Sequence, residues 1–194
     1  EAEGYPAVLN FANIKDASGE PSMAGIQHLN LIFCGSLKGE LKDGLSKKVL
    51  LASSRKSQLL NSFMAQAPYA QILKDFQSDD RQNDLIVRIH GKFKSAYPDG
   101  PPKEDSKDKK DGENKEDAAK PAPKDSLKES AKESSVVIVT DVDMFLDEFC
   151  VSKQKFLGRS FIQPFNDNLI FIQNVAEQLS GDNDLISIRC KKVK

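Results

Sequence analysis

The fold prediction rests on the stretch Ser135-Val136-Val137-Ile138-Val139-Thr140-Asp141-Val142-Asp143. Its side chains are aliphatic from Val136 to Val139, and an acidic residue follows Thr140. Such a run is typical of a strand that is covered on both faces. The next segment, Val142 to Phe149, carries apolar residues at helical spacing. The stretch therefore predicts a buried strand that leads directly into a helix.

Other segments outside this stretch also have strand character, through alternation or through short apolar runs. They are His28–Cys34, Lys48–Ser53, Asp84–Phe93 and Leu185–Cys190. Strands that alternate with helices predict an α/β fold, a three-layer sandwich with a mixed, mostly parallel sheet of the flavodoxin-like or Rossmann-like kind. The segment Asp84–Phe93 reaches Ser135–Thr140 without an intervening helix, so this pair can be antiparallel.

A second helix is predicted close to the end of the chain. Asn166, Asp167 and Asn168 are good N-cap candidates because their side chains can accept hydrogen bonds from free backbone N–H groups. Apolar residues follow at helical spacing: Leu169, Ile172, Val175, Ala176 and Leu179. Gly181 stands where a left-handed residue commonly ends a helix.

A highly charged segment, residues 99–133, divides the chain. It holds 11 acidic and 9 basic residues among 35, no aromatic residue, and Leu127 as its one large aliphatic side chain. Such a segment cannot bury enough apolar surface to offset the entropy of ordering, so a long disordered loop is predicted. The remaining blocks are small, and we expect one α/β domain over 1–194 with this loop on its surface.

Composition excludes several classes of function. The 194 residues have a formal net charge of −1, so there is no basic face for nucleic acid. The longest aliphatic run is far shorter than the roughly 20 residues that cross a bilayer. Cys34, Cys150 and Cys190 are too widely spaced for a zinc motif. We therefore expect no metal site, no cofactor and no nucleic-acid partner.

Candidate ligand-binding residues follow two predicted strands: Ser53, Ser54 and Arg55 after one, Asp141 and Asp143 after the other. The hydroxyl and basic groups could hold an anion, or the serines could satisfy the local backbone. The aspartates could bind Mg²⁺, as in a metal-assisted phosphohydrolase, or cap the following helix. His28 and His90 could join Asp141 or Asp143 in a metal site, or they could be hydrogen-bonded structural residues.

Three phrases carry a family resemblance. They are Gly91-Lys92-Phe93-Lys94-Ser95-Ala96-Tyr97-Pro98, the stretch from Val136 to Phe145, and the stretch from Asn166 to Arg189 that contains Gly181-Asp182-Asn183-Asp184-Leu185-Ile186-Ser187-Ile188. In this order they resemble the GldG-type family of ABC-transporter auxiliary proteins, known from gliding motility and from uncharacterised transport systems. The resemblance covers most of the chain outside the charged segment.

The resemblance implies a periplasmic, non-enzymatic α/β domain, related to a domain of an intraflagellar transport protein. It implies a parent chain anchored by membrane helices outside this sequence, with an ABC permease and ATPase as partners. The family has no established catalytic residues, so none is assigned. The function expected is therefore binding of a partner or substrate; the alternatives are the phosphohydrolase and a protein-interaction scaffold.

Overall fold

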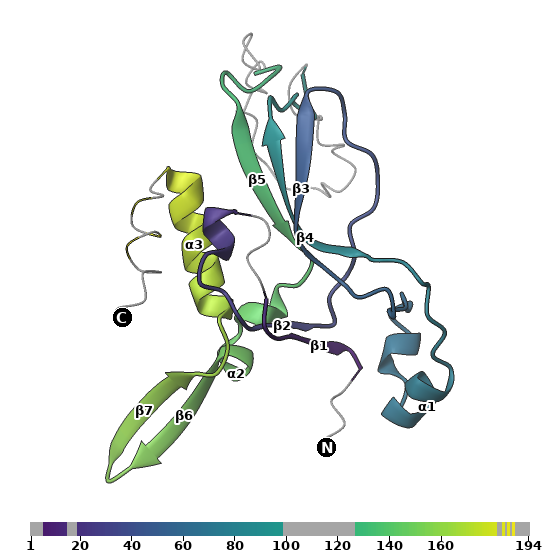
Figure 1. Ribbon diagram of the computed structural model, residues 1–194, viewed down its shortest axis with the longest axis vertical. Coiled ribbons are helices and arrows are strands. Elements are labelled where there is room, and N and C mark those ends of the chain that lie inside the picture. Colours follow the sequence, from purple (N-terminus) through teal and green to yellow (C-terminus); the bar gives the residue numbers. More distant parts are fainter. Residues whose placement is uncertain are drawn as a thin grey trace, which may run out of the picture.

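The computed structural model describes residues 6–14, 19–98 and 127–181, together with Asp184, Ile186 and Ile188 (Figure 1). The strands of this described part are β1 (Val8–Phe11), β2 (Leu29–Ile32), β3 (Leu45–Ala52), β4 (Asp84–Gly91), β5 (Ser134–Val139), β6 (Val151–Phe156) and β7 (Arg159–Pro164). Its helices are α1 (Tyr69–Lys74), α2 (Asp147–Cys150) and α3 (Asn168–Ser180), and its short 3-10 helices are η1 (Pro21–Met23), η2 (Met64–Gln66) and η3 (Asp143–Phe145).

The strands form three small sheets, and every pair is antiparallel. The central sheet has the order β3-β4-β5, with Val49 opposite Val87 and Val87 opposite Ile138. β1 pairs with β2, and β6 pairs with β7. The prediction of a mostly parallel flavodoxin-like or Rossmann-like sandwich is therefore wrong.

The connections explain this correction. Parallel neighbours require a long crossover, usually a helix that packs on the sheet. Between β3 and β4 the only α-helix in the described chain is the six-residue α1, which lies in a lobe beside the sheet (Figure 1). Between β4 and β5 lies the charged segment, whose last residues extend the ladder through the Lys94–Glu129 bridge. The antiparallel β4–β5 pair that the sequence allowed is present.

Several predicted elements are confirmed, with changed detail. β2, β3, β4 and β5 lie within or close to the predicted strands. β5 is an edge strand with exposed and half-buried side chains, not a strand covered on both faces. The helix predicted over 142–149 is broken at Leu146, whose ψ of 141° separates η3 from α2.

The prediction for the C-terminal region is mixed. α3 begins at Asn168 with Asp167 as its N-cap residue, and Gly181 ends it with a φ of 86°, as predicted. The strand predicted over 185–190 lies largely outside the described residues, and Ile186 and Ile188, which are described, are helical. Within the described chain, no helix has both the length and the apolar character that crossing a bilayer requires.

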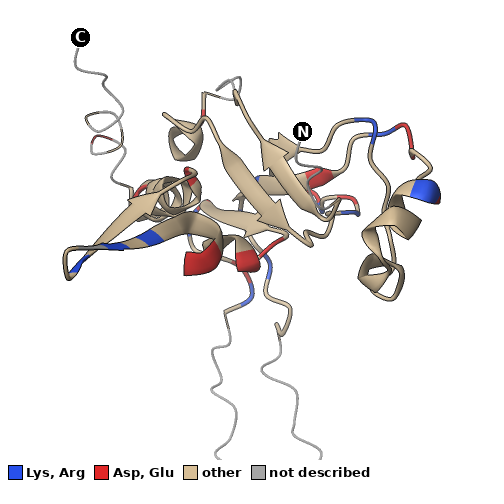
Figure 2. Ribbon diagram, turned by 90° about the horizontal axis from the view of Figure 1, so that it is seen from below, with Lys and Arg blue, Asp and Glu red and all other residues tan. Residues whose placement is uncertain are grey.

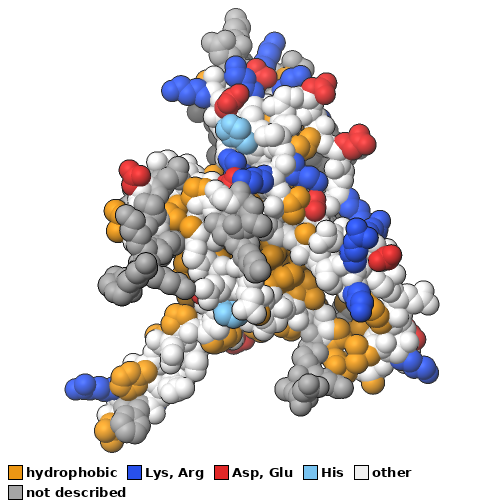
Figure 3. All heavy atoms as spheres, viewed as in Figure 1, with side chains coloured by type: hydrophobic (Ala, Val, Ile, Leu, Met, Phe, Trp, Pro, Cys, Tyr) orange, Lys and Arg blue, Asp and Glu red, His pale blue; other side chains and the backbone are white. Residues whose placement is uncertain are grey.

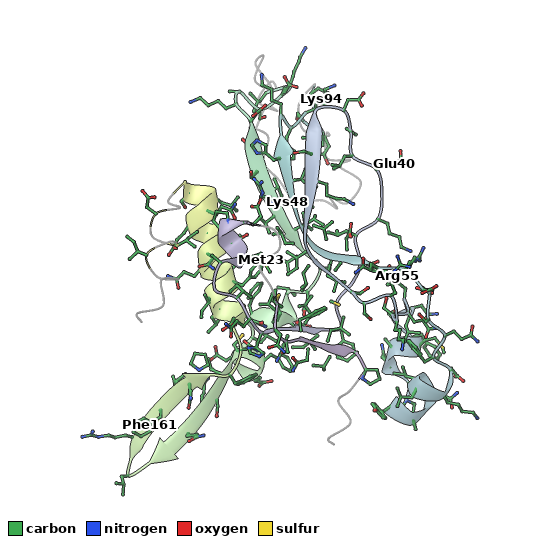
Figure 4. All side chains as sticks on the ribbon, in the orientation of Figure 1. Met23, Glu40, Lys48, Arg55, Lys94 and Phe161 are labelled. Carbon is green, nitrogen blue, oxygen red and sulfur yellow. The ribbon has the colours of Figure 1, made fainter. Side chains whose placement is uncertain are left out.

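The core draws side chains from both sides of the charged segment. Its buried members are Met23, Ile26, Leu29, Leu31, Leu50, Leu51, Leu85, Ile86, Met144, Phe171 and Val175. Helix α3 packs against η1, and Figure 4 shows Met23 at this contact. The described residues on either side of the charged segment thus share one apolar interior. The single domain over 1–194 stays a prediction. Disorder over 99–133 also stays a prediction, because residues 99–126 lie outside the described part.

Candidate functional site

The two predicted ligand loops do lie at one edge of the central sheet. β3 and β5 both run antiparallel to β4, so their carboxyl ends point the same way. The chain between Gly35 and Leu37 follows this edge. The N–H of Gly35 donates to the carbonyl of Thr140 at 3.0 Å, and the N–H of Leu37 donates to that of Asp84 at 2.9 Å. This edge therefore has two ends. The β3 end carries the loop that follows β3, and the β5 end carries the loop that follows β5.

At the β5 end, the side chain of Asp141 is buried and accepts hydrogen bonds from the backbone. Its Oδ2 accepts from the N–H of Ile32 at the end of β2. Its Oδ1 accepts from the N–H of Asp143 at 2.8 Å and from the N–H of Met144 at 3.2 Å. The carboxylate thus joins β2, β5 and η3, which confirms for Asp141 the interpretation as a cap of the following helical turn.

The electrostatics of Asp141 agree with a structural role. Burial raises the pKa of its carboxyl, the nearby charge of Asp143 adds to this, and the three backbone donors offset only part of the shift. A divalent cation would have to displace the donors that already occupy both oxygens, while Asp143 is exposed at the start of η3. The described residues contain no group of three His, Cys, Asp or Glu side chains that could hold a metal ion. The geometry therefore gives no support to a Mg²⁺ site.

The two histidines contact residues other than the candidate aspartates. The backbone N–H of His28 donates to Asp167 Oδ2 at 2.9 Å. The ring of His90 lies 3.0 Å from the hydroxyl of Ser135 through Nδ1 and 3.5 Å from Glu133 through Nε2. The backbone of His28 thus contacts Asp167 and the ring of His90 contacts Ser135 and Glu133, and none of these contacts involves Asp141 or Asp143.

At the β3 end, hydroxyl and amide groups form a small hydrogen-bonded network. Ser53 Oγ accepts from the N–H of Asn83 at 2.9 Å and lies 3.0 Å from Ser57 Oγ. Ser57 Oγ also accepts from the side-chain amide of Asn83 at 3.1 Å. The network ties the loop after β3 to the residue before β4. Ser53 and Ser57 therefore satisfy local groups, which is how loop serines commonly act.

This network borders a cavity of about 440 Å³. Ser53, Ser54, Ser57 and Asn83 line its polar end. Its walls are mainly apolar, and they come from β1, from the start of β4 and from the lobe of α1: Val8, Leu9, Phe11, Leu59, Leu60, Ile72, Phe76 and Leu85. Figure 3 shows hydrophobic side chains gathered over this lobe. A mostly apolar cavity with a few polar groups at one end is typical of a binding site.

Cys34 lies on the cavity wall, close to the charge of Asp141. Burial raises the pKa of the Cys34 thiol to about 11, and the negative charge of Asp141 contributes to the shift. Only the thiolate is a strong nucleophile, so at neutral pH this cysteine is an inert apolar wall group. The cavity therefore offers surface for contact and no activated nucleophile at Cys34.

The five predicted ligand residues thus have different fates. Ser53 and Ser54 line the cavity, whereas Arg55 follows them in the exposed loop and is not among the lining residues. Figure 4 places Arg55 at the border between the sheet and the lobe of α1. Asp141 is buried at the other end of the sheet edge, and Asp143 is exposed there. The structure therefore does not assemble these residues into one polar site.

Sequence reasoning missed the apolar cavity wall. The sequence patterns assign no role to Leu59, Leu60 or the residues of β1. The available signal was the clustering of large apolar side chains directly after a strand end, in a segment interrupted by Pro68. A segment that is apolar but too short and irregular for a packed helix can line a pocket instead.

A second buried carboxylate, Glu20, was also missed. Its Oε1 lies 2.8 Å from Lys48 Nζ and 3.0 Å from Arg88 NH2, and its Oε2 accepts from Gln178 Nε2 at 2.9 Å. Burial by itself raises the pKa of Glu20, but the hydrogen bonds with Lys48 and Gln178 and the charges of Arg88 and Lys48 together lower it. This cluster joins the segment before η1 to β3, β4 and α3.

The comparison with known protein families gives a match over most of the chain. The chain matches, over residues 1–175, the model of an auxiliary ABC-transport family described as "ABC-type uncharacterized transport system". The chain therefore belongs to this family of transport-associated proteins. No curated protein and no solved structure matches it.

Proposed function

We propose that this chain is a non-enzymatic domain of a GldG-like ABC-transport component, and that it binds a partner or substrate at the cavity beside the β3 end. The membership in an auxiliary transport family supports the transport context. The three family-like phrases beginning at Gly91, Val136 and Asn166 support the GldG-like subtype. The partners proposed are the permease and ATPase subunits of the same system.

One observation carries the proposal of binding without catalysis. The cavity walls expose apolar side chains, while Ser53, Ser57 and Asn83 at its polar end are already hydrogen-bonded to each other. Leu59, Leu60 and Phe76 remain partly open to solvent, although apolar side chains of this size gain free energy when they are covered. Such a surface gains by receiving an apolar side chain or an apolar ligand.

The binding proposal is tested by isolating the chain from its own membranes. The natural protein that contains this chain is tagged, and after mild detergent extraction it should retain the permease and the ATPase. The variant Leu60→Asp places a charge on the cavity wall and should lower the recovery of both subunits at least about tenfold. The matched control Leu146→Asp changes an equally apolar, exposed residue outside the cavity and should leave recovery unchanged.

Three results would contradict this proposal. Equal recovery with Leu60→Asp and with the unaltered chain would show that the cavity is not the contact surface. Recovery of other proteins only would favour the interaction scaffold. A Mg²⁺-dependent phosphatase activity that disappears in Asp143→Ala would overturn the non-enzymatic part.

We also propose that the domain lies on the periplasmic side of the inner membrane. The GldG-like resemblance supports this location. In spheroplasts, externally added protease should degrade the chain while a cytoplasmic marker stays intact. Protection of the chain until the membrane is lysed would place it on the other side and contradict the proposal.

A further inference from the structure

The hairpin formed by β6 and β7 projects away from the rest of the molecule (Figure 1). Its two strands are in register from Val151 opposite Pro164 to Phe156 opposite Arg159. Leu157 and Gly158 form the turn, and both have positive φ angles, of 49° and 75°, as in a tight two-residue hairpin. All side chains of β7 are exposed. The hairpin therefore has no packing partner along most of its length in the described structure.

Large apolar side chains lie at the turn of this hairpin and farther back along it, with Phe161 opposite Gln154 and Ile162 opposite Lys153. Leu157 at the turn is 85% exposed, Ile162 is 64% exposed and Phe161 is 52% exposed. Ile162 and Phe161 are neighbours in one strand, so their side chains point to opposite faces of the hairpin. Figure 4 shows Phe161 on the hairpin, away from the core. Exposed apolar residues therefore lie at the turn and, behind the basic residues, on both faces of the hairpin.

The charge of the hairpin is of one sign. Between Phe149 and Asn166 the sequence has Lys153, Lys155 and Arg159 and no acidic residue, in a chain whose net charge is −1. Lys153 is bound to Asp147 of α2 at 2.7 Å, at the base of the hairpin. Among the described residues, neither Lys155 nor Arg159 has a carboxylate within ion-pair distance. Figure 2 shows basic positions along the hairpin and acidic positions on the short helix at its base.

We propose that the β6–β7 hairpin binds the surface of an anionic lipid bilayer through its turn. Leu157 inserts, and Lys155 and Arg159, which follow directly behind the turn in the register, lie beside the lipid headgroups. Basic residues next to exposed aromatic and aliphatic side chains are the pattern by which peripheral segments bind such a surface. This inference goes beyond the cavity, which lies on a different part of the molecule, and it does not depend on what the cavity binds.

The distribution of apolar residues favours a bilayer over a protein partner. A protein that docks on a hairpin covers one face or pairs with one edge, and this requires the apolar residues on one side. A bilayer interface surrounds the part of the hairpin that enters it, so it can cover Leu157 at the turn and contact Phe161 and Ile162 on opposite faces behind it. The unpaired basic residues have the sign that an anionic surface attracts.

The absence of tryptophan in the chain makes a direct test possible. The variant Leu157→Trp introduces a single indole at the exposed turn. Its emission should shift to shorter wavelength with vesicles that contain about one third phosphatidylglycerol in phosphatidylcholine, and brominated lipids should quench it. The control Phe63→Trp replaces a residue that is 82% exposed in the lobe near α1, and its emission should not change.

Charge and apolar contributions are separated by two further variants, each measured by vesicle sedimentation. Lys155→Ser combined with Arg159→Ser should weaken binding about 25-fold at low salt, since one basic residue at an anionic surface contributes about fivefold. Phe161→Ser combined with Ile162→Ser should also weaken binding at high salt, where the charge contribution is screened. Lys38→Ser combined with Lys42→Ser, two exposed lysines elsewhere, should have no comparable effect.

Several outcomes would overturn the membrane-binding proposal. No emission change of Leu157→Trp with anionic vesicles would overturn it, as would an equal change in Phe63→Trp. An emission change that depends on protein concentration without vesicles would show pairing of the hairpin with a second copy and would also overturn it. Because circular dichroism can confirm that each variant is folded, a loss of binding cannot be mistaken for unfolding.

Discussion

The β5 end and the β3 end of the central sheet lie at the same edge and carry similar polar residues, yet they are built for different tasks. At the β5 end, Asp141 is buried and its oxygens accept three backbone donors. At the β3 end, Ser53 belongs to a network that borders an open, mostly apolar cavity. The difference shows that a polar residue after a strand becomes available to a ligand only where the backbone does not already use it.

The largest effect is expected from removing the buried carboxylate. Asp141→Ala leaves the N–H groups of Ile32, Asp143 and Met144 without their acceptor, and we expect a loss of about 3 kcal/mol in the free energy of unfolding. Asp143→Ala, at the exposed neighbouring position, should change the free energy of unfolding by less than about 0.5 kcal/mol. Urea denaturation of both variants measures the contrast.

This pair of variants tests whether the β5 end has a structural role that the β3 end lacks. If Asp143→Ala cost as much as Asp141→Ala, the two aspartates would act together, as metal ligands or otherwise. If Asp141→Ala were neutral, the hydrogen bonds at the β5 end would not hold the edge. Either result would remove the distinction between a structural end and an open end.

A smaller effect is expected at Cys34, which lies between the two ends. Because the pKa of its thiol is raised to about 11, its thiolate fraction at pH 8 should be about 100-fold below that of an ordinary cysteine, and iodoacetamide should react correspondingly slowly. Asp141→Asn removes one negative charge that contributes to the shift, so the reaction should become faster. Peptide mass spectrometry can measure both rates at Cys34.

A fast reaction of Cys34 in the unaltered chain would contradict this account. It would mean that the thiol at the cavity wall is activated, and the cavity would then need to be considered for covalent chemistry. An unchanged rate in Asp141→Asn would show instead that the two ends of the edge are electrostatically independent.

The next expected effect concerns pH and sharpens the contrast between two buried carboxylates. The pKa of Glu20 is lowered, so its stabilising contribution is present above the pKa of an unfolded glutamate and is lost as the pH falls through the lower folded value. The pKa of Asp141 is raised, so its contribution has the opposite sign and is lost as the pH rises through its folded value.

Glu20→Gln should therefore destabilise the protein at pH 7 by about 1–2 kcal/mol, because Lys48 and Arg88 lose their anionic partner, and should destabilise it less at about pH 3. Denaturation at both pH values provides the measurement. A difference between the unaltered chain and Glu20→Gln that stays constant with pH would show that the charge of Glu20 does not stabilise the fold.

Much of the local structure could be predicted from the sequence, whereas the pairing of the strands could not. The start of α3 near Asp167 and its end at Gly181 follow from local capping chemistry. Apolar runs located β2, β3, β4 and β5, because each has a short aliphatic pattern. The direction of pairing depends on how the connections pack, and a six-residue helix such as α1 cannot serve as a crossover.

The missed features have physical causes as well. The β6–β7 hairpin buries little apolar surface, so its strands lack the alternation that identifies a half-buried strand. The role of Asp141 as a helical cap was predicted from its position, but its bond to Ile32 joins residues 109 positions apart, and no local pattern indicates it. The partners of Glu20 are likewise distant in sequence, on β3, β4 and α3.

The most direct test of the central claim compares the two ends within the assembled transport system. A photo-cross-linking amino acid is placed either at Leu60 on the cavity wall or at Val142 beside Asp141. Val142 is 79% exposed, whereas Leu60 is 38% exposed. If the β3 end is the contact surface, irradiation of intact cells should yield a cross-linked transport subunit from Leu60 and none from Val142, despite the greater exposure of Val142. A cross-link from Val142 alone, or none from Leu60, would contradict the account.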